Sequence, residues 1–169
     1  MSVGMETERK FIIRLPEIAL LEEQTGYTRS DIVQTYFDSE PGLTHRVRKR
    51  TGKNGTVYTE TKKRRVSRLS SIEDEIEIGE EEYLARLATL KILGSPLHKT
   101  RHTFAYGTHT FEVDIYAQWK EHAVMEVEFA REDETIALPP FIEIVKEATG
   151  TKEYSNFSMA IAFPSERFD

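Results

Sequence analysis

The stretch Glu6-Thr7-Glu8-Arg9-Lys10-Phe11-Ile12-Ile13 decides the predicted fold. Its second half is aromatic and β-branched, which predicts a β-strand. Because alternate side chains of a strand point to the same face, Glu6, Glu8 and Lys10 share one face. Two carboxylates and an ammonium group in one row are unusual for a core face and would suit a divalent cation held beside a phosphate. The alternative is an exposed edge strand whose charges prevent aggregation.

Length and composition limit the classes of protein to consider. The chain has 169 residues, enough for a substantial core, and we expect residues 1–169 to form a single domain. Apolar residues make up 38% and charged residues 31%, as in a soluble globular protein. The net charge of −6 argues against general nucleic-acid binding, which favours a basic surface. The absence of cysteine excludes disulfides, thiolate nucleophiles and cysteine-ligated zinc.

The sequence offers no signal for a membrane or an export pathway. No apolar run approaches the length of a transmembrane span, and the N-terminus lacks an apolar signal region. We therefore expect no membrane partner, and a cytoplasmic location is the default. The oligomeric state stays open between a monomer and a homodimer.

Alternating apolar and polar residues, interrupted by turn signals, predict eight strands and four helices. Lys53-Asn54-Gly55 marks a hairpin between two of the strands. Helix starts are indicated by Pro16-Glu17 and by the acidic residues after Gly79, and Gly26 and Gly94 are expected to end two helices. The predicted strands cover residues 6–13, 32–37, 43–50, 56–64, 72–78, 97–106, 110–117 and 123–130, and the predicted helices cover residues 16–25, 80–93, 141–148 and 154–162.

Several strands carry an apolar face opposite a charged face, and in an ordinary open sheet the charged face would meet water. If the sheet instead closes with the charged rows inside, the fold is α+β: a closed eight-stranded antiparallel β-barrel with a charged lumen and helices packed on the outside. Such a barrel is about wide enough to enclose one small ligand. Charge in so narrow a space must be offset, and an acidic cluster beside a basic one calls for a divalent cation and a polyphosphate. The basic rows are Arg46/Arg48/Arg50 and Lys99/Arg101, the acidic rows are Glu73/Glu75/Glu77, Glu112/Asp114 and Glu126/Glu128, and Lys10 and Lys62 lie in mixed rows.

The ordered set of charged motifs resembles the CYTH superfamily, also called triphosphate tunnel metalloenzymes. This family includes class IV adenylyl cyclases, thiamine triphosphatases and inorganic triphosphatases. The resemblance runs from Glu6 to about Ala160, so it covers nearly the whole chain. A single three-residue motif would be weak evidence, but the ordered set is specific. The matching motifs are Glu6-Thr7-Glu8-Arg9-Lys10, Arg46-Val47-Arg48, Glu60-Thr61-Lys62, Glu73-Asp74-Glu75, Lys99-Thr100-Arg101, Glu112-Val113-Asp114, Glu126-Val127-Glu128 and Lys152-Glu153-Tyr154-Ser155-Asn156.

The sequence departs from the family pattern at two places. Many small bacterial members carry an arginine two positions before the middle acidic pair, where this chain has Ser71, and Arg68 nearby is out of phase. One basic contact is therefore in question. A glycine that is common after the Glu-x-Asp strand is also replaced, around Gln118-Trp119-Lys120, so we expect that turn to differ. The chain shows no C-terminal helical phosphate-binding extension, and we expect a stand-alone CYTH domain.

The resemblance implies a role for each charged row. Carboxylates suit Mg²⁺ or Mn²⁺, whereas arginine pairs with two phosphate oxygens and lysine acts as a point charge. Arg50 and Glu77 have surface charge as the main alternative. The implied metal ligands are Glu6, Glu8, Asp114, Glu126 and Glu128; the implied substrate ligands are Lys10, Arg46, Arg48, Lys62, Lys99, Arg101 and Lys152; and the implied catalytic residues are Glu6, Glu8, Lys10, Lys62, Glu73 and Glu75.

The activity implied by the resemblance is metal-dependent hydrolysis of a triphosphate, either inorganic tripolyphosphate or a small organic triphosphate. One alternative is a class IV-type adenylyl cyclase, in which the ribose 3′-hydroxyl attacks the α-phosphate of ATP. The other is a non-catalytic polyphosphate-binding module, which the missing arginine at Ser71 keeps open. In each case the partner is a small molecule that contains a triphosphate.

Overall fold

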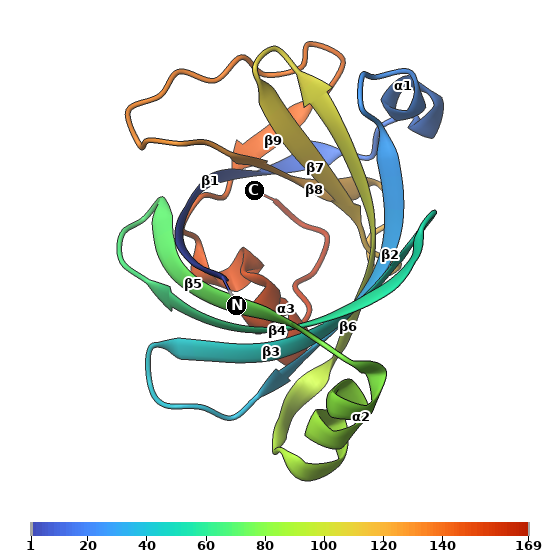
Figure 1. Ribbon diagram of the computed structural model, residues 1–169. Coiled ribbons are helices and arrows are strands. Elements are labelled where there is room, and N and C mark those ends of the chain that lie inside the picture. The colour runs from blue at the N-terminus through green and yellow to red at the C-terminus, as the bar shows by residue number, and fades with distance from the viewer. Residues whose placement is uncertain (1, 169) are drawn as a thin grey trace.

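The computed structural model describes residues 2–168, which form an antiparallel barrel with three α-helices and a short 3₁₀ helix, η1 (Figure 1). The sheet order is β5-β4-β3-β2-β6-β7-β8-β1-β9, and the additional pairing of β5 with β1 closes the first eight strands into a barrel. The predicted closed eight-stranded barrel is therefore confirmed. The strands are β1 (Ser2–Arg14), β2 (Thr28–Phe37), β3 (Leu43–Gly52), β4 (Gly55–Arg65), β5 (Ser70–Ile78), β6 (Ile92–Tyr106), β7 (His109–Ile115), β8 (His122–Glu128) and β9 (Ile144–Glu147). The helices are α1 (Ile18–Glu22), α2 (Glu80–Thr89), η1 (Lys152–Tyr154) and α3 (Asn156–Ile161).

Strand β1 is the seam at which the barrel closes. Its residues 2–7 pair with β5, and its residues 8–14 pair with β8. Beyond Thr7 the edge of β1 that β5 has left is taken up by β9, which pairs with residues 11–13. The Glu-x-Glu-x-Lys motif therefore lies where three strands meet.

The prediction of a helix over residues 141–148 is wrong, because Ile144–Glu147 form strand β9. Ile144 and Val145 are β-branched and suit a strand. The unpaired backbone groups on the edge of β1 also need partners, and β9 supplies them. A side-chain pair fixes this contact: the Arg9 guanidinium donates to both carboxylate oxygens of Glu147, at 3.2 and 2.7 Å.

The second helix is shorter than the sequence predicted. It ends at Thr89 rather than near Leu93, and Gly94 lies inside strand β6 instead of ending the helix. Gly94 has a φ of +66°, and a Cβ there would overlap the backbone carbonyl of Ala160. A glycine is therefore required because α3 passes directly against this strand.

The helices occupy different sides of the barrel. Helix α2 covers the outer face, where Phe37, Val47, Ile78 and Tyr83 pack together, and α1 places Leu21 in a second outer cluster with Phe104 and Phe111. Helix α3 instead packs against inward-facing side chains of the barrel, among them Tyr36 and Leu97, and appears within the ring of strands in Figure 1. Among the described helices, none has the length and apolar character needed to cross a lipid bilayer.

Candidate active site

The inward-facing residues of four strands change from charged to apolar in the same direction. Along β1 they run Glu6, Glu8, Lys10, Ile12, and along β8 they run Glu128, Glu126, Val124. The inward-facing residues of β6 change in the same way and reach Leu97, and those of β7 lead to Tyr116 directly after the strand. The interior therefore has a charged end and an apolar end. The apolar end consists of Ile12, Leu97, Tyr116 and Val124, covered by Met159 and Ala160 of α3.

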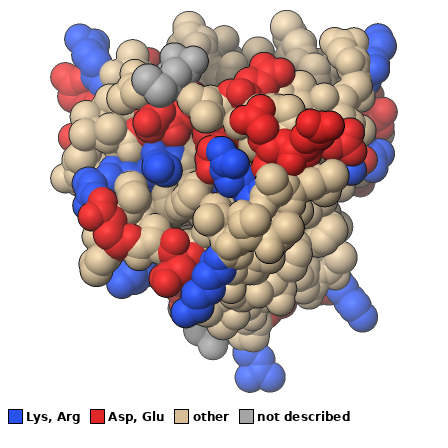
Figure 2. All heavy atoms as spheres, turned by 60° about the horizontal axis from the view of Figure 1, so that its bottom comes forward, with Lys and Arg blue, Asp and Glu red and all other residues tan. Residues whose placement is uncertain are grey.

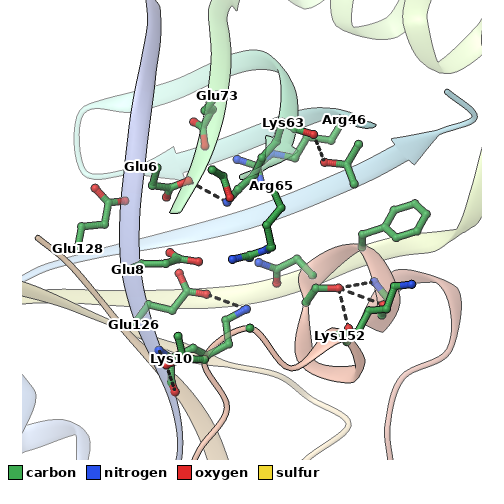
Figure 3. A pocket seen from close by; sticks show the side chains of 18 of the residues that line it. Glu6, Glu8, Lys10, Arg46, Lys63, Arg65, Glu73, Glu126, Glu128 and Lys152 are labelled. Carbon is green, nitrogen blue, oxygen red and sulfur yellow. Dashed lines mark hydrogen bonds and ion pairs between the residues drawn. The ribbon is translucent and has the colours of Figure 1, made fainter. Parts of the chain in front are cut away.

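The charged end encloses a cavity of about 590 Å³. Figure 2 shows acidic and basic side chains next to one another across one face of the molecule, and Figure 3 shows those of the cavity converging from several strands. The predicted site residues that line the cavity are Glu6, Glu8, Lys10, Arg46, Arg48, Glu73, Glu75, Arg101, Glu126, Glu128 and Lys152. The sequence did not decide whether Arg50 and Glu77 face the lumen or the surface. Arg50 lines the cavity, whereas Glu77 is exposed and lies outside it.

Three carboxylates form a cluster at the charged end. Oxygen atoms of Glu6, Glu8 and Glu128 lie within 4.8 Å of one another. Glu8 and Glu128 face each other as cross-strand partners on β1 and β8, which explains why two like charges come so close. Lys63 offsets part of the charge, because its Nζ lies 2.8 Å from Glu6. The cluster therefore gathers carboxylates from two strands around one point.

The cluster has strongly shifted pKa values. Burial, followed by the charge of Glu126, raises the pKa of Glu8 to about 8. Burial and the adjacent Glu6 raise the pKa of Glu73 to about 7 and that of Glu128 to about 8. At Glu6 burial acts in the same direction, but the Lys63 ammonium outweighs it and holds the pKa below its ordinary value. These carboxylates are crowded enough to favour either shared protons or a bound cation.

The donor set fits a hard divalent cation. Three carboxylates that converge on one point supply the oxygen ligands that Mg²⁺ and Mn²⁺ prefer. Glu126 lies close by, but its carboxylate is 3.4 Å from the Lys10 ammonium, which holds its pKa below the ordinary value against the effect of burial. Glu6, Glu8 and Glu128 would therefore hold the ion directly, with Glu126 balancing Lys10.

A row of arginines from β3 faces the acidic cluster. Arg48 donates twice to the Gln34 side-chain oxygen, at 3.1 and 2.9 Å, and Arg50 donates to Ser30 at 3.0 Å, so neutral groups hold these two guanidinium groups. Burial, with the charges of Arg46 and Arg101, lowers the pKa of Arg48 to about 9. Arg46 is 4.0 Å from Glu75, and its buried Nε has no hydrogen-bond partner within residues 2–168. This row has donors left over for an anion.

The prediction that Lys62 lies in the lumen is wrong, and Lys63 takes that place. Lys62 is exposed, whereas Lys63 lines the cavity and pairs with Glu6. The hairpin register decides this: Gly52 faces Gly55, so Arg46 faces Thr61 and Thr44 faces Lys63. Since directly opposed residues point to the same face, Thr61 and Lys63 share the side of Arg46, and Lys62 points outward. Alternation along β4 alone does not show which of the two adjacent lysines faces inward, so the pairing with β3 was needed.

Asp114 and Lys99 are also placed differently from the prediction. Both side chains are fully buried and absent from the cavity lining. Asp114 accepts two hydrogen bonds from Arg101, at 2.8 and 2.9 Å, and lies 2.9 Å from the Lys99 ammonium. These bases outweigh burial and hold the pKa of Asp114 well below its ordinary value. Asp114 is therefore committed to two cations, and the prediction that it is a metal ligand does not fit its position.

A second layer links this ion group to α3. Lys99 donates to the Asn156 side-chain oxygen at 3.3 Å, and the Tyr116 hydroxyl donates to the same oxygen at 2.9 Å. Asn156 is the first residue of α3, so the helix that covers the apolar end also fixes the lysine beneath the cavity. The sequence had aligned Asn156 with a family motif but gave it no role.

Comparison with solved structures identifies the fold family. No protein-family model and no curated protein sequence matches the chain. The inorganic triphosphatase NE1496 is 25% identical with a TM-score of 0.59, over 95% of this chain and 97% of that one. A Pyrococcus horikoshii protein, PH1819, reaches a TM-score of 0.62 at 17% identity, over 76% of this chain and 80% of that one. A candidate adenylyl cyclase from Hippeastrum with a dominant triphosphatase activity reaches 0.52 at 17% identity, over 73% and 80%.

The closed barrel is the fold expected of the CYTH superfamily. The charged motifs of the chain occupy the inner face of the barrel, as the resemblance implied, except that Lys63 takes the place of Lys62; Lys99 and Asp114 are on this face but lie buried beneath the cavity lining. The likeness to the inorganic triphosphatase NE1496 extends over nearly the full length of both chains.

Proposed function

We propose that this CYTH domain is a metal-dependent triphosphatase that hydrolyses inorganic tripolyphosphate or a small organic triphosphate inside the barrel. The observation that carries the proposal is the division of one cavity into two parts. One part gathers Glu6, Glu8 and Glu128 within 4.8 Å, and the other presents arginines with unused donors. A pure anion-binding module has little use for the acidic part.

The residues have separate tasks in this proposal. Arg46 and Arg48 bind phosphate oxygens and spread the negative charge that develops as the phosphoanhydride breaks. Glu6, Glu8 and Glu128 would hold Mg²⁺ or Mn²⁺, which when bound would supply Lewis-acid stabilisation of the developing phosphate charge. The pair Lys10–Glu126 keeps a lysine next to the metal ligands, where its ammonium group offers a further phosphate contact.

The neighbouring carboxylates and Lys152 of η1 complete the proposed site. Glu73 and Glu75 line the same cavity beside Arg46, where they orient its guanidinium or position water. Lys152 of η1 lines the cavity from the C-terminal segment and would cover the outermost phosphate.

Product analysis tests the proposal against its closest alternative. The chain would be incubated with tripolyphosphate or ATP and either Mg²⁺ or Mn²⁺, and free phosphate and cyclic AMP would be quantified. We expect phosphate release that requires the divalent ion. Cyclic AMP as the main product from ATP would favour a class IV-type cyclase, and tight tripolyphosphate binding without turnover at any divalent ion would favour a binding module.

A further inference from the structure

We propose that Arg65 is a substrate-binding residue, and that it supplies inside the lumen the positive charge that its cross-strand neighbour Ser71 lacks. This inference rests on the proposed function, because it assumes that the cavity receives a polyphosphate. It concerns the end of β4 and the start of β5, where Ser71 replaces an arginine that is common in the family.

The sheet register places Arg65 and Ser71 directly opposite each other. They form the last of the β4–β5 pairs, next to Arg64 opposite Ile72 and two pairs along from Lys63 opposite Glu73. Since Lys63 points into the lumen and faces alternate along a strand, Arg65 points the same way. Ser71 is buried and lines the cavity, but its side chain ends at a short hydroxyl. The space beside it is therefore open to the longer side chain from across the ladder.

Figure 3 shows Arg65 directed into the lumen toward Glu8. One guanidinium nitrogen, Nη1, donates to the backbone carbonyls of Arg68 at 2.8 Å and Ser67 at 3.3 Å. These two carbonyls belong to the β4–β5 turn and hold the guanidinium from one side. The remaining N–H groups are left to face the cavity, in the planar arrangement that suits two phosphate oxygens.

The charge of Arg65 is not offset by a neighbouring acid. Within residues 2–168, no carboxylate lies within ion-pair distance of Arg65. Three other lumen bases are paired with acids: Lys63 with Glu6, Lys10 with Glu126, and Arg101 with Asp114. Arg48 and Arg50, like Arg65, are held by neutral groups. Arg65 is thus a base held in place by neutral carbonyls, with its positive charge still available to an anion.

Two nearby arginines do not have this arrangement. Arg64 points away from the lumen and donates to Glu40 at 2.9 Å, which makes it a matched control one residue away. Arg68 also lines the cavity and, like Arg65, is exposed, but it lies 3.7 Å from Glu147 and packs against Gly150. Its charge is shared with an acid, so Arg65 is the better candidate for the missing contact.

The first experiment measures tripolyphosphate binding by calorimetry for the wild type, Arg65→Ala and Arg64→Ala. We expect Arg65→Ala to weaken binding about tenfold, since a hydrogen bond to a charged group is lost, while Arg64→Ala stays within about twofold of the wild type. Thermal unfolding without ligand confirms that both variants are folded. Equal affinities for the two variants would overturn the inference.

The second experiment moves the charge across the strand pair. The double variant Arg65→Ser with Ser71→Arg should recover most of the binding that Arg65→Ser alone loses, because the two positions share one face. A double variant no better than Arg65→Ser would also overturn the inference.

The same measurements separate the two proposals. If the wild type binds tripolyphosphate but never releases phosphate, the hydrolase proposal fails while the binding comparison still decides the role of Arg65. If the wild type hydrolyses tripolyphosphate and Arg65→Ala binds and reacts normally, only the inference about Arg65 fails. A wild type that does not bind tripolyphosphate overturns both.

Discussion

Compared with the apolar end of the barrel interior, the charged end is organised for a ligand rather than for packing. At the apolar end Leu97, Tyr116 and Val124 are almost completely buried against α3, and their side chains carry no charge that needs a partner. At the charged end Glu8 and Glu128 face each other with raised pKa values, and the Arg46 Nε has no partner within the described chain. The apolar end therefore stabilises the barrel. The crowded charges of the charged end lower the free energy of unfolding but form a binding site.

The largest expected effect is on turnover at the charged end. Glu8→Gln removes one carboxylate from the proposed ion site, and we expect hydrolysis of tripolyphosphate to fall by about ten-thousandfold, roughly 5.4 kcal/mol in the activation barrier. Much of the metal-free anion binding should remain, because the arginine row is untouched. Phosphate-release kinetics and calorimetry measure the two effects, and Arg48→Ala is the comparison, since it should weaken binding as well as rate. The same modest defect in both variants would contradict the division of the cavity.

The next effect concerns the boundary between the two ends. Asp114→Asn leaves Lys99 and Arg101 buried without their shared counter-charge, and we expect a loss of roughly 4 kcal/mol in the free energy of unfolding at pH 7. Because the folded-state pKa of Asp114 is depressed, its contribution is complete above the ordinary value of 3.8 and is lost as the pH falls below it. Denaturant unfolding of both proteins at several pH values measures this. A variant as stable as the wild type at pH 7 would mean that Asp114 does not hold these bases.

At the apolar end, Leu97→Ala should cost about 3 kcal/mol of unfolding free energy, because it leaves a cavity beneath α3. The residue makes no contribution to the charged lining, so the Michaelis constant for tripolyphosphate should stay within about twofold at a temperature where the variant is folded. Denaturant unfolding and steady-state kinetics give the two numbers. A large change in the Michaelis constant with unchanged stability would reverse the comparison.

Ligands should stabilise the molecule through the charged end alone. Tripolyphosphate at a hundredfold excess over its dissociation constant should add about 2.7 kcal/mol to the free energy of unfolding, and orthophosphate should add less because it reaches only part of the row. Mg²⁺ with a slowly hydrolysed triphosphate should add more. Thermal shift assays on the wild type and on Leu97→Ala should show the same increment. No response to any polyphosphate would mean that the lumen does not bind one.

The smallest effect tests the hairpin register. Lys63→Met should lower kcat/KM for tripolyphosphate about tenfold, roughly 1.4 kcal/mol, because it removes a base from the lumen. Lys62→Met, the adjacent and exposed control, should stay within about twofold. Steady-state kinetics on the pair decides between the two faces of β4, and a larger defect for Lys62→Met would restore the original placement.

The charged rows were readable from the sequence because strand alternation is local. Glu6, Glu8 and Lys10 share a face through covalent geometry alone, and the same holds for Arg46 with Arg48 and Glu126 with Glu128. The barrel was expected from these rows together with the resemblance to the CYTH superfamily. Strand β9 was missed because the reason that Ile144 and Val145 are extended is the open edge of β1, which lies about 130 residues earlier in the chain.

The sequence by itself determined which residues alternate, the sign of each charged row and the family that those rows resemble. Only the tertiary structure decided which lysine of β4 enters the lumen, because one residue of turn length reverses both faces of a strand. Only the tertiary structure showed that Asp114 is not placed as a metal ligand. Its carboxylate is on the correct face but forms ion pairs with two buried bases of the neighbouring strand. Alternation is set by covalent geometry within a strand, whereas register and ion pairing depend on the partner strand and on how its side chains share charge in a space that excludes water.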